Sequence, residues 1–594
     1  MCGVFGHTKP TLGGVNHARK ALHSLSHRGP DQWGEWRDDK VYMGHRRLSI
    51  LDLSERGRQP MADRDGRVVV AVNGEIYNFQ RLRRELEPQY AFASRSDSEV
   101  VLHGYKEWGM EGLLDRIDGM YAFCVYDAEK QRIYLARDRA GIKPLYYALI
   151  GGVFAWASEL KALREFFGRD RLETDVTALY DFLTYLYVPA PKSLYRNVFK
   201  LEPGHYACFD LASGRLDVKP YWRLDPTVRE WSEAEACDEL VRLVDESVKE
   251  QLVSDVPVGV FLSGGLDSSI VAESANRFSA HIQTFTIQVD EPSRDESPFA
   301  RRLADHIGTE HHVRACKAGD AYEWIDRIQG WYDEPFGDMS AIPTHLVSRF
   351  SREKIVVALS GDGGDELFGG YRWYSGMLEH SRQRIGGWHG LRRWTARSKR
   401  WLGRSFVNRA IRRLEFDYVL NDLEYYLRLM GGLLPEDKRE YARQWGIDSD
   451  YDDFWHFRKH WRPDLPLLTR LQYIDFHTYL PDDILTKVDR ASMQVALEVR
   501  VPLLSRKLIE FAFSLPESIR YAHGQMKGLI KQAYRGRLPS EILHKPKQGF
   551  SLPLKAWNLA DGPRMSIQEQ IVKKFSSVKL QKRLTRSFFQ VQPH

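Results

Sequence analysis

A mainly apolar run, VGVFL at 258–262, leads directly into the glycine- and serine-rich segment SGGLDSS at 263–269. The run is typical of a buried strand, and the helix-type pattern at 268–278 completes a strand–loop–helix unit. Strand-type segments at 283–289 and 354–359 follow, separated by a helix-type segment at 297–307. This alternation predicts a doubly wound α/β sheet from about residue 235, with a mostly helical region at 375–480.

The loop at 263–269 has the composition of an anion site. Its two glycines let backbone N–H groups approach a phosphate, and its serines add hydroxyl donors at a helix N-terminus. It lacks the lysine of a Walker A loop, which favours pyrophosphate handling over γ-phosphoryl transfer. Asp267 places a negative charge among these phosphate-binding groups, which is explained if its carboxylate binds Mg²⁺. The alternative is a glycine-rich turn with a capping aspartate.

A second acidic, glycine-rich loop, SGDGGDE at 360–366, follows the strand-type segment 355–359. In open parallel sheets, ligands bind outside the carboxyl ends of the strands. Two such loops at one edge predict a shared site for a nucleotide and its metal ion. A surface turn is the alternative, but apolar residues flank the loop on both sides. Lys527 is a candidate for neutralising charge on an adenylate, although alone it is an ordinary surface lysine.

The first 205 residues have a different pattern of strand-type and helix-type segments. Short strand-type runs at 68–72, 120–126 and 132–136 are bounded by turn residues and separated by helix-type stretches at 80–86 and 98–108. This mixture predicts a layered α+β domain with largely antiparallel sheets. The proline-containing segment 208–234 is a candidate linker.

Cys2 is a candidate nucleophile. If Met1 is removed, the α-amino group of Cys2, with a reference pKa of about 7.7–8.0, can take the thiol proton directly or through a water. The alternative is a small apolar residue that opens a strand.

Three other positions support a catalytic site in the first domain. Asn73 and Gly74, at an expected sharp turn, could form an oxyanion hole, with a type I′ hairpin as the alternative. Arg47 could clamp an α-carboxylate. Asp97 could pair with an α-ammonium group, cap the next helix, or do both.

Charge and cysteine content exclude several other classes of function. The net charge of +6, from 86 basic and 80 acidic residues, is poor evidence for nucleic-acid binding in so long a chain. The five cysteines form no CxxC pair, which argues against zinc and disulfide frameworks and favours a cytoplasmic location. The segment MCGVFGHTKP lacks the basic start and apolar run typical of a secretory signal, and no membrane span is expected. The basic end of the chain indicates a solvated tail or surface helix, with a binding role as the alternative.

Both halves, in this order, resemble the glutamine-hydrolysing asparagine synthetases. The resemblance covers roughly residues 2–555 and rests on motifs that occur together. They are MCG at 1–3, HRGPD at 27–31, RLSI at 47–50, NGEIYN at 73–78, SGGLDSS at 263–269, SGDGGDELFGGY at 360–371, KVDR at 487–490 and EVRVP at 498–502.

The resemblance implies an N-terminal-nucleophile glutaminase with an αββα sandwich at 2–207, a linker at 208–234 and an ATP-pyrophosphatase domain at 235–555. The basic tail at 556–594 receives no role. The implied residues are Cys2, Asn73, Gly74, Asp362 and Lys527 for catalysis; Arg47, Leu48, Ile50, Asn73, Glu75 and Asp97 for glutamine; Leu262, Ser263, Gly264, Gly265, Asp267, Ser268, Ser269, Ile287, Ser360 and Gly361 for ATP; and Asp267 and Asp365 for Mg²⁺.

The implied reaction forms asparagine from aspartate, with glutamine as the ammonia source, ATP and Mg²⁺ as cofactors, and an internal channel for ammonia. The partners are then small molecules rather than nucleic acid or membrane, and a homodimer stays open. Two departures concern the acceptor: Asp362 stands where the best-known enzymes have glutamate, and Met339 where they have arginine. The alternative acceptor is a uronic-acid sugar of a surface polysaccharide or a peptide. A non-catalytic scaffold would be expected to have lost Cys2 or Asp267, and both are present.

Overall fold

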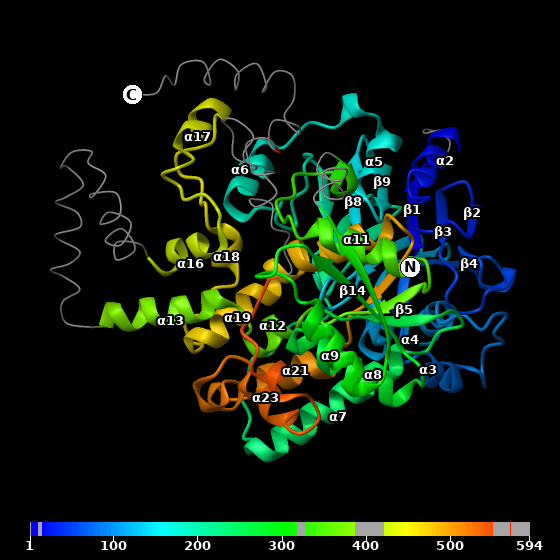
Figure 1. Cartoon of the computed structure of the whole chain (residues 1–594). Helices are drawn as coiled ribbons and strands as arrows, with labels where there is room; N and C mark the ends of the chain where they lie inside the picture. Colours follow the sequence, from blue (N-terminus) through cyan, green and yellow to red (C-terminus); the bar gives the residue numbers. More distant parts are fainter. Residues whose placement is uncertain are drawn as a thin grey trace.

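The computed structural model describes residues 2–9, 15–317, 327–328, 330–385, 421–549 and 571. In Figure 1 the blue N-terminal strands lie at one side of the molecule and the yellow helices at the other. The segment 556–594, predicted to be a basic tail, lies outside the described residues apart from Ile571.

The first domain contains two antiparallel sheets of six strands each. The first has the order β10 (Val198–Lys200), β8 (Tyr146–Ile150), β9 (Val153–Ala157), β1 (Cys2–Thr8), β3 (Val41–Arg47), β2 (Gln32–Arg37). The second has the order β12 (Leu216–Pro220), β11 (His205–Asp210), β7 (Arg132–Arg137), β6 (Gly119–Asp127), β5 (Val68–Ile76), β4 (Met61–Ala62).

The two sheets are covered by helices on their outer faces. Strand side chains alternate between the faces of a sheet, so Val4 lies in the core between the sheets while Phe5 packs beneath α2 (Val15–His23) and α5 (Leu160–Phe167). On the other side, α4 (Glu99–Arg116) packs on β5, and α3 (Phe79–Leu86) packs on α4. The predicted αββα sandwich is therefore confirmed.

The turn expected at Asn73–Gly74 is wrong. β5 continues to Ile76, and Asn73 and Gly74 pair with Ala122 and Tyr121 of β6. A side chain at position 74 would not fit, because an added Cβ would lie 2.0 Å from the carbonyl oxygen of Met120. The close approach of two central strands, and not a hairpin, explains this glycine.

The segment predicted as a linker, 208–234, overlaps the sheet. The end of β11 and all of β12 fall within it, and β12 is an edge strand of the second sheet. After a stretch without helix or strand, α7 (Glu233–Gln251) begins the second domain with a capping box between Ser232 and Glu235. The domain boundaries themselves stay predictions.

The second domain contains a parallel sheet of five strands with the order β15 (Glu310–Cys316), β14 (Gln283–Val289), β13 (Val258–Phe261), β16 (Val357–Leu359), β17 (Glu498–Arg500). Val260 and Leu359 share a core with α8 (Leu266–Phe278) and α9 (Ser297–Ile307). Phe285 and Ala358 share another with α11 (Ala341–Arg352). Helices on both faces confirm the predicted doubly wound sheet.

The remaining helices and turns are distributed over both domains, and residues 386–420 of the predicted helical region lie outside the described residues. They are α6 (Val176–Tyr185), α12 (Gly364–Phe368), α13 (Arg372–Ile385), α16 (Asp422–Met430), α17 (Arg439–Trp445), α18 (Trp455–Lys459), α19 (Leu467–His477), a π-helical segment η3 (Leu480–Leu485), α20 (Thr486–Met493), α21 (Arg506–Ser514), α22 (Glu517–Arg520), α23 (Gly528–Ala533) and α24 (Ser540–Leu543), with short 3₁₀ turns η1 (Glu55–Gly57), η2 (Arg169–Arg171), η4 (Pro502–Leu504) and η5 (Ala522–Gly524). No helix within the described part of the chain has the length and apolar character needed to cross a membrane.

Candidate active sites

Cys2 opens β1 directly opposite Arg47 on β3. Its backbone N–H donates to Asn73 Oδ1 over 2.9 Å, and its carbonyl accepts from Arg28 Nε over 3.0 Å. Burial raises the pKa of the Cys2 thiol, whereas the Leu48 N–H group and the charge of Arg47 lower it. The structure thus brings Cys2 together with both residues that the sequence predicted as its neighbours, Arg47 and Asn73.

Asn73 is fully buried, and its side chain has one free donor. Because Oδ1 accepts the Cys2 N–H, the amide nitrogen Nδ2 must point elsewhere, and it has no hydrogen-bond partner among the described residues. A buried N–H group without a partner costs free energy unless a ligand uses it. Such a group next to a cysteine is suited to bind an oxyanion.

Arg47 lies in the pocket, but its terminal nitrogens already have acceptors in the chain. Nη1 donates to Gln32 Oε1 (2.7 Å) and to the Ser54 carbonyl (3.2 Å), and Nη2 donates to the carbonyls of Leu51 (2.9 Å) and Asp52 (2.6 Å). The guanidinium therefore holds the loop after β3 in place. Leu48 and Ile50, in the same segment, are buried.

Glu75 and Asp97 form a buried acidic pair in the same region. Asp97 Oδ2 accepts the Ile76 N–H over 2.7 Å, and the Asp97 carbonyl accepts the Val100 N–H at the start of α4 over 3.1 Å. A capping role for Asp97 stays a prediction. Burial, with the charge of Asp97, raises the pKa of Glu75 well above its ordinary range. Burial likewise raises the pKa of Asp97.

The sequence interpretation assigned no role to four residues that surround this pocket. Arg28 and Asp489 form a buried pair, and Glu498 and Arg500 of β17 approach Glu75. All four belong to motifs of the resemblance, HRGPD, KVDR and EVRVP. Those motifs could have indicated the residues, but nothing local predicts that β17 of the second domain reaches the first.

The two glycine-rich loops meet at the point where the strand order reverses. The chain runs from β13 outward to β15 and then returns to β16 on the other side of β13. The loop after β13 is tightened by Ser263, whose Oγ accepts the Gly265 N–H over 3.2 Å. An added Cβ at Gly361, in the loop after β16, would lie 2.6 Å from the Ser268 nitrogen. A reversal of this kind is where doubly wound sheets bind ligands.

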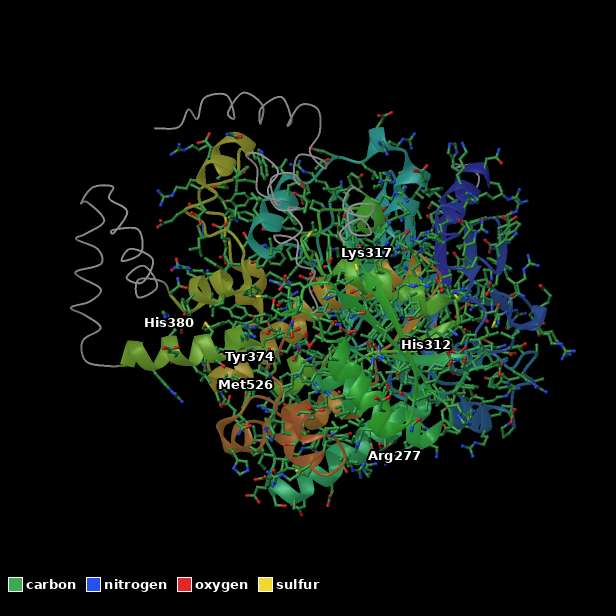
Figure 2. All side chains as sticks on the ribbon, viewed as in Figure 1. Arg277, His312, Lys317, Tyr374, His380 and Met526 are labelled. Atoms are coloured by element: carbon green, nitrogen blue, oxygen red, sulfur yellow. The ribbon has the colours of Figure 1, made fainter. Side chains whose placement is uncertain are left out.

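Lys527 connects the acids of both loops. Its Nζ contacts Asp267 Oδ2 and Asp365 Oδ1, and Lys547 contacts the other oxygen of Asp365. Burial works against the charge on Asp365, but the two lysines keep its pKa below the ordinary value. Met526, beside Lys527, packs against the core that contains Tyr374 (Figure 2). Of the predicted ATP contacts, Leu262 directly follows β13 and Ile287 lies within β14, and both are buried.

A further charged group lies beside the second loop. Lys487 Nζ is 3.1 Å from Asp338 Oδ2, and Asp362 accepts from Ser360 Oγ over 2.7 Å. Burial opposes the charged form of Lys487, but Asp338, Asp362 and Asp483 raise its pKa overall. Met339, where the resemblance expects arginine, packs against the core beneath α11.

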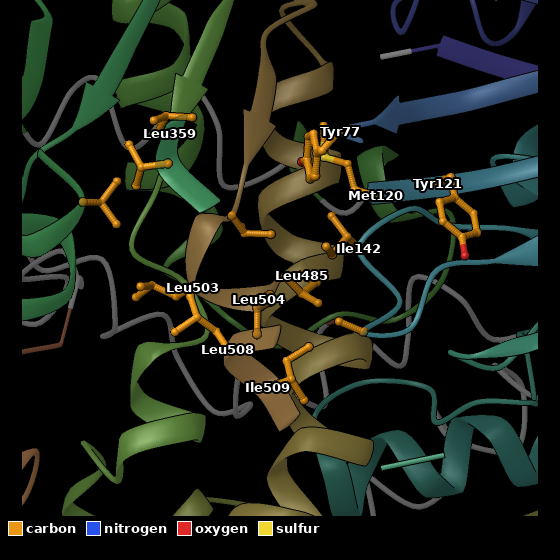
Figure 3. Close-up of a cluster of buried hydrophobic side chains, with 14 of the residues drawn as sticks. Tyr77, Met120, Tyr121, Ile142, Leu359, Leu485, Leu503, Leu504, Leu508 and Ile509 are labelled. Carbon is orange, nitrogen blue, oxygen red and sulfur yellow. The ribbon is translucent and has the colours of Figure 1, made fainter. Parts of the chain in front are cut away.

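An apolar core continues from the cysteine pocket to the nucleotide loops. It includes Met120 and Ile142 of the first domain and Leu359, Leu485 and Leu503 of the second (Figure 3). Its members come from both domains, so the apolar packing is continuous between the two sites.

Comparison with known proteins decides the family. The model of a glutamine amidotransferase domain matches residues 1–222, and the asparagine synthase model matches residues 239–591. The chain belongs to the asparagine synthase family. This confirms the predicted enzyme class, an ATP-dependent glutamine amidotransferase that acts as a carbon–nitrogen ligase.

The relatives of this family member cover nearly the whole chain. Asparagine synthetase 1 of Bacillus subtilis is 32% identical over 570 residues, which are 94% of this chain and 88% of the relative. A putative asparagine synthetase of Mycobacterium tuberculosis is 34% identical over 593 residues, with the same two shares of 94% and 88%. Amidase chry2 of Gibberella zeae is 29% identical over 630 residues, 94% of this chain and 90% of the relative.

Proposed function

We propose that the protein is a glutamine-hydrolysing asparagine synthetase, which makes asparagine, glutamate, AMP and pyrophosphate from aspartate, glutamine and ATP. The observation that carries the first half is the bond from Cys2 N–H to Asn73 Oδ1, which leaves Asn73 Nδ2 buried and free. Two facing glycine-rich loops at the sheet reversal support the second half.

In the first site, Cys2 is the nucleophile. Its own α-amine, once free, takes the thiol proton, and the thiolate attacks the glutamine amide carbon. Asn73 Nδ2 and the Gly74 N–H stabilise the oxyanion, and ammonia leaves before water releases glutamate. Glu75, Asp97 and backbone groups at Leu48 and Ile50 hold the glutamine. Arg47 contributes by fixing the loop at 51–54 beside them.

In the second site, the loops at 263–269 and 360–366 hold the nucleotide. A carboxylate oxygen of aspartate attacks the α-phosphorus, pyrophosphate leaves, and the nitrogen of ammonia displaces AMP. Lys527 offsets the charge on the reacting phosphate, and Asp362 helps to orient the loop through Ser360. Ammonia crosses the apolar layer that includes Met120 and Ile142.

Asp267 and Asp365 suit Mg²⁺. Asp267 Oδ1 is a buried carboxylate oxygen with no partner among the described residues. Groups of three or more metal-binding side chains are absent from the described ranges. Mg²⁺ commonly binds one or two carboxylates and completes its shell with substrate phosphates and water, so two acids suffice. The ion would supply positive charge to the leaving pyrophosphate. No disulfide joins any of the five cysteines, all of which lie within the described ranges, and this supports the proposed cytoplasmic location.

The test separates the two half-reactions. Cys2→Ala should abolish glutamine-dependent product but leave ammonia-dependent pyrophosphate release intact, since the second site has its own groups. Retained glutaminase activity would refute the role of Cys2.

The identity of the acceptor needs its own test, because Met339 stands where the best-known asparagine synthetases have a positively charged arginine. Lys487 is a cation in that region, and it pairs with Asp338. A relative named as an amidase favours the second candidate acceptor, a uronic-acid sugar or a peptide carboxylate. Pyrophosphate release is measured with aspartate, a uronic acid and a carboxyl-terminal peptide as separate acceptors. No stimulation by aspartate above background excludes asparagine synthesis and retains the enzyme class.

A further inference from the structure

Arg500 is a buried arginine of the second domain whose side chain enters the glutamine pocket of the first. It is 0% exposed, and its Nη2 lies 3.5 Å from Glu75 Oε2. Nε donates to Glu498 Oε1 over 2.7 Å, and Nη1 donates to the carbonyls of Gln251 (2.6 Å) and Val253 (2.8 Å). The guanidinium is therefore anchored on one side, and its remaining nitrogen faces Glu75.

The backbone of the same residue holds the nucleotide loop. Arg500 pairs with Leu359 in the parallel ladder of β16 and β17, and its carbonyl accepts the N–H of Ser360 over 2.9 Å. Ser360 is the first residue of the acidic loop. Within one residue, the main chain thus contacts the nucleotide site and the side chain contacts the glutamine site.

The contact between Arg500 and Glu75 is incomplete. At 3.5 Å it is an ion pair rather than a hydrogen bond. Arg500 Nη2, Glu75 Oε1 and the Tyr77 hydroxyl all lack hydrogen-bond partners among the described residues. When a small movement or a ligand completes the hydrogen bonds of such buried atoms, the free energy of the protein falls.

We propose that Arg500 is a positioning residue, which transmits the state of the nucleotide loop at 360–366 to Glu75 in the glutamine pocket. The inference rests on the proposed function and adds regulation to it. A shift of Ser360 on nucleotide binding moves the Arg500 main chain through their shared hydrogen bond. Because Nη1 is anchored, Nη2 then changes its distance to Glu75 and sets the orientation of that carboxylate toward glutamine.

The experiment measures the KM for glutamine and the kcat of glutaminase, with and without ATP and acceptor, in wild type, Arg500→Lys and Arg500→Gln. In wild type, the nucleotide should lower the KM for glutamine. Arg500→Gln should raise that KM about 10- to 100-fold, because Glu75 loses its buried partner, and should abolish the response to nucleotide. Arg500→Lys, which keeps the charge but not the fork, should restore part of the KM and little of the response.

Each variant carries its own control, namely pyrophosphate release with saturating ammonia, which should stay close to the wild-type rate. Glu75→Gln is the second variant in case Arg500→Gln does not fold; it leaves Arg500 in place and should also lose the nucleotide response. A wild type without any nucleotide response, or a response that survives in these variants, overturns the inference. A wild type that neither hydrolyses glutamine nor releases pyrophosphate refutes the proposed function instead.

Discussion

Arg28 of the first domain and Asp489 of the second are joined by two hydrogen bonds, of 2.8 and 3.0 Å, with both side chains buried. The same guanidinium donates through Nε to the carbonyl of Cys2, and Nη1 also bonds Glu159 over 2.8 Å. The main chain of Cys2, the proposed nucleophile, is therefore held by the guanidinium of Arg28, and Asp489 of the second domain balances the charge of that guanidinium. The two domains share this polar contact in addition to their apolar core.

Asp489→Ala is expected to destabilise the protein strongly. Removal of one partner leaves Arg28 buried without half of its counter-charge, which typically costs about 3–5 kcal/mol. The free energy of unfolding, followed by fluorescence in urea, should fall by that amount, and glutaminase activity should fall with it. Glu85→Ala breaks the exposed pair with Arg81 and should change the free energy by less than about 0.5 kcal/mol. Equal losses in the two variants would contradict a structural role for the buried pair.

Asn73→Asp is expected to lower the kcat of glutaminase by about 100- to 1000-fold, because it removes the oxyanion donor Nδ2. The acceptor for the Cys2 N–H remains, so the pocket keeps its main-chain bond. Release of glutamate is measured beside ammonia-dependent pyrophosphate release, which should not change. The exposed residue Asn197 provides a matched variant, Asn197→Asp, whose rates should equal those of wild type. A normal kcat in Asn73→Asp would exclude this amide from the oxyanion hole.

Lys527→Met is expected to stop pyrophosphate formation with either nitrogen source, because Asp267 and Asp365 lose the ammonium between them. A loss of about 100-fold or more is typical when a charge that stabilises a transition state is removed. Glutaminase activity without ATP should persist. Lys531→Met, in the next turn, removes only a 3.3 Å contact to Gln525 and should retain activity. Full ammonia-dependent activity in Lys527→Met would remove this lysine from the mechanism.

Glu366→Gln is expected to make stability less dependent on pH. Burial, with the charge of Asp365, raises the pKa of Glu366 from 4.5 to about 8 against the hydrogen bond from Tyr371. The folded state therefore binds a proton that the unfolded state releases between pH 4.5 and 8. The stabilisation from this proton is fully present below pH 4.5, the pKa of Glu366 in the unfolded state, and it is lost as the pH rises through 8. The free energy of unfolding is measured in urea at several pH values. That of wild type should fall below that of Glu366→Gln toward pH 8.5, which lies about half a unit beyond the raised pKa.

Glu129, with a side chain that is 75% exposed, is the control for this series. Glu129→Gln should follow the pH dependence of wild type. A Glu366→Gln profile parallel to that of wild type would show that Glu366 titrates in the same range folded and unfolded.

The local pattern of the chain determined three of the five strands of the second domain, β13, β14 and β16, and the order of its two glycine-rich loops. The apolar segments at 258–262 and 283–289 became β13 and β14, and the pattern at 297–307 became α9. Strand and helix periodicity are properties of neighbouring residues, so they can be recognised without the fold. For the same reason Cys2, the 263–269 loop and the 360–366 loop could be singled out beforehand.

Only the tertiary structure decided what these segments contact. Asn73 and Gly74 have the composition of a hairpin turn, yet β6 extends β5 through them, because long-range ladder bonds outweigh a local turn preference. β17 has three residues, too few for a periodic signal, and its pairing with β16 brings Arg500 to Glu75. Contacts between residues hundreds of positions apart, such as Arg28 and Asp489, depend on how the two domains pack, and no short stretch of sequence contains that information.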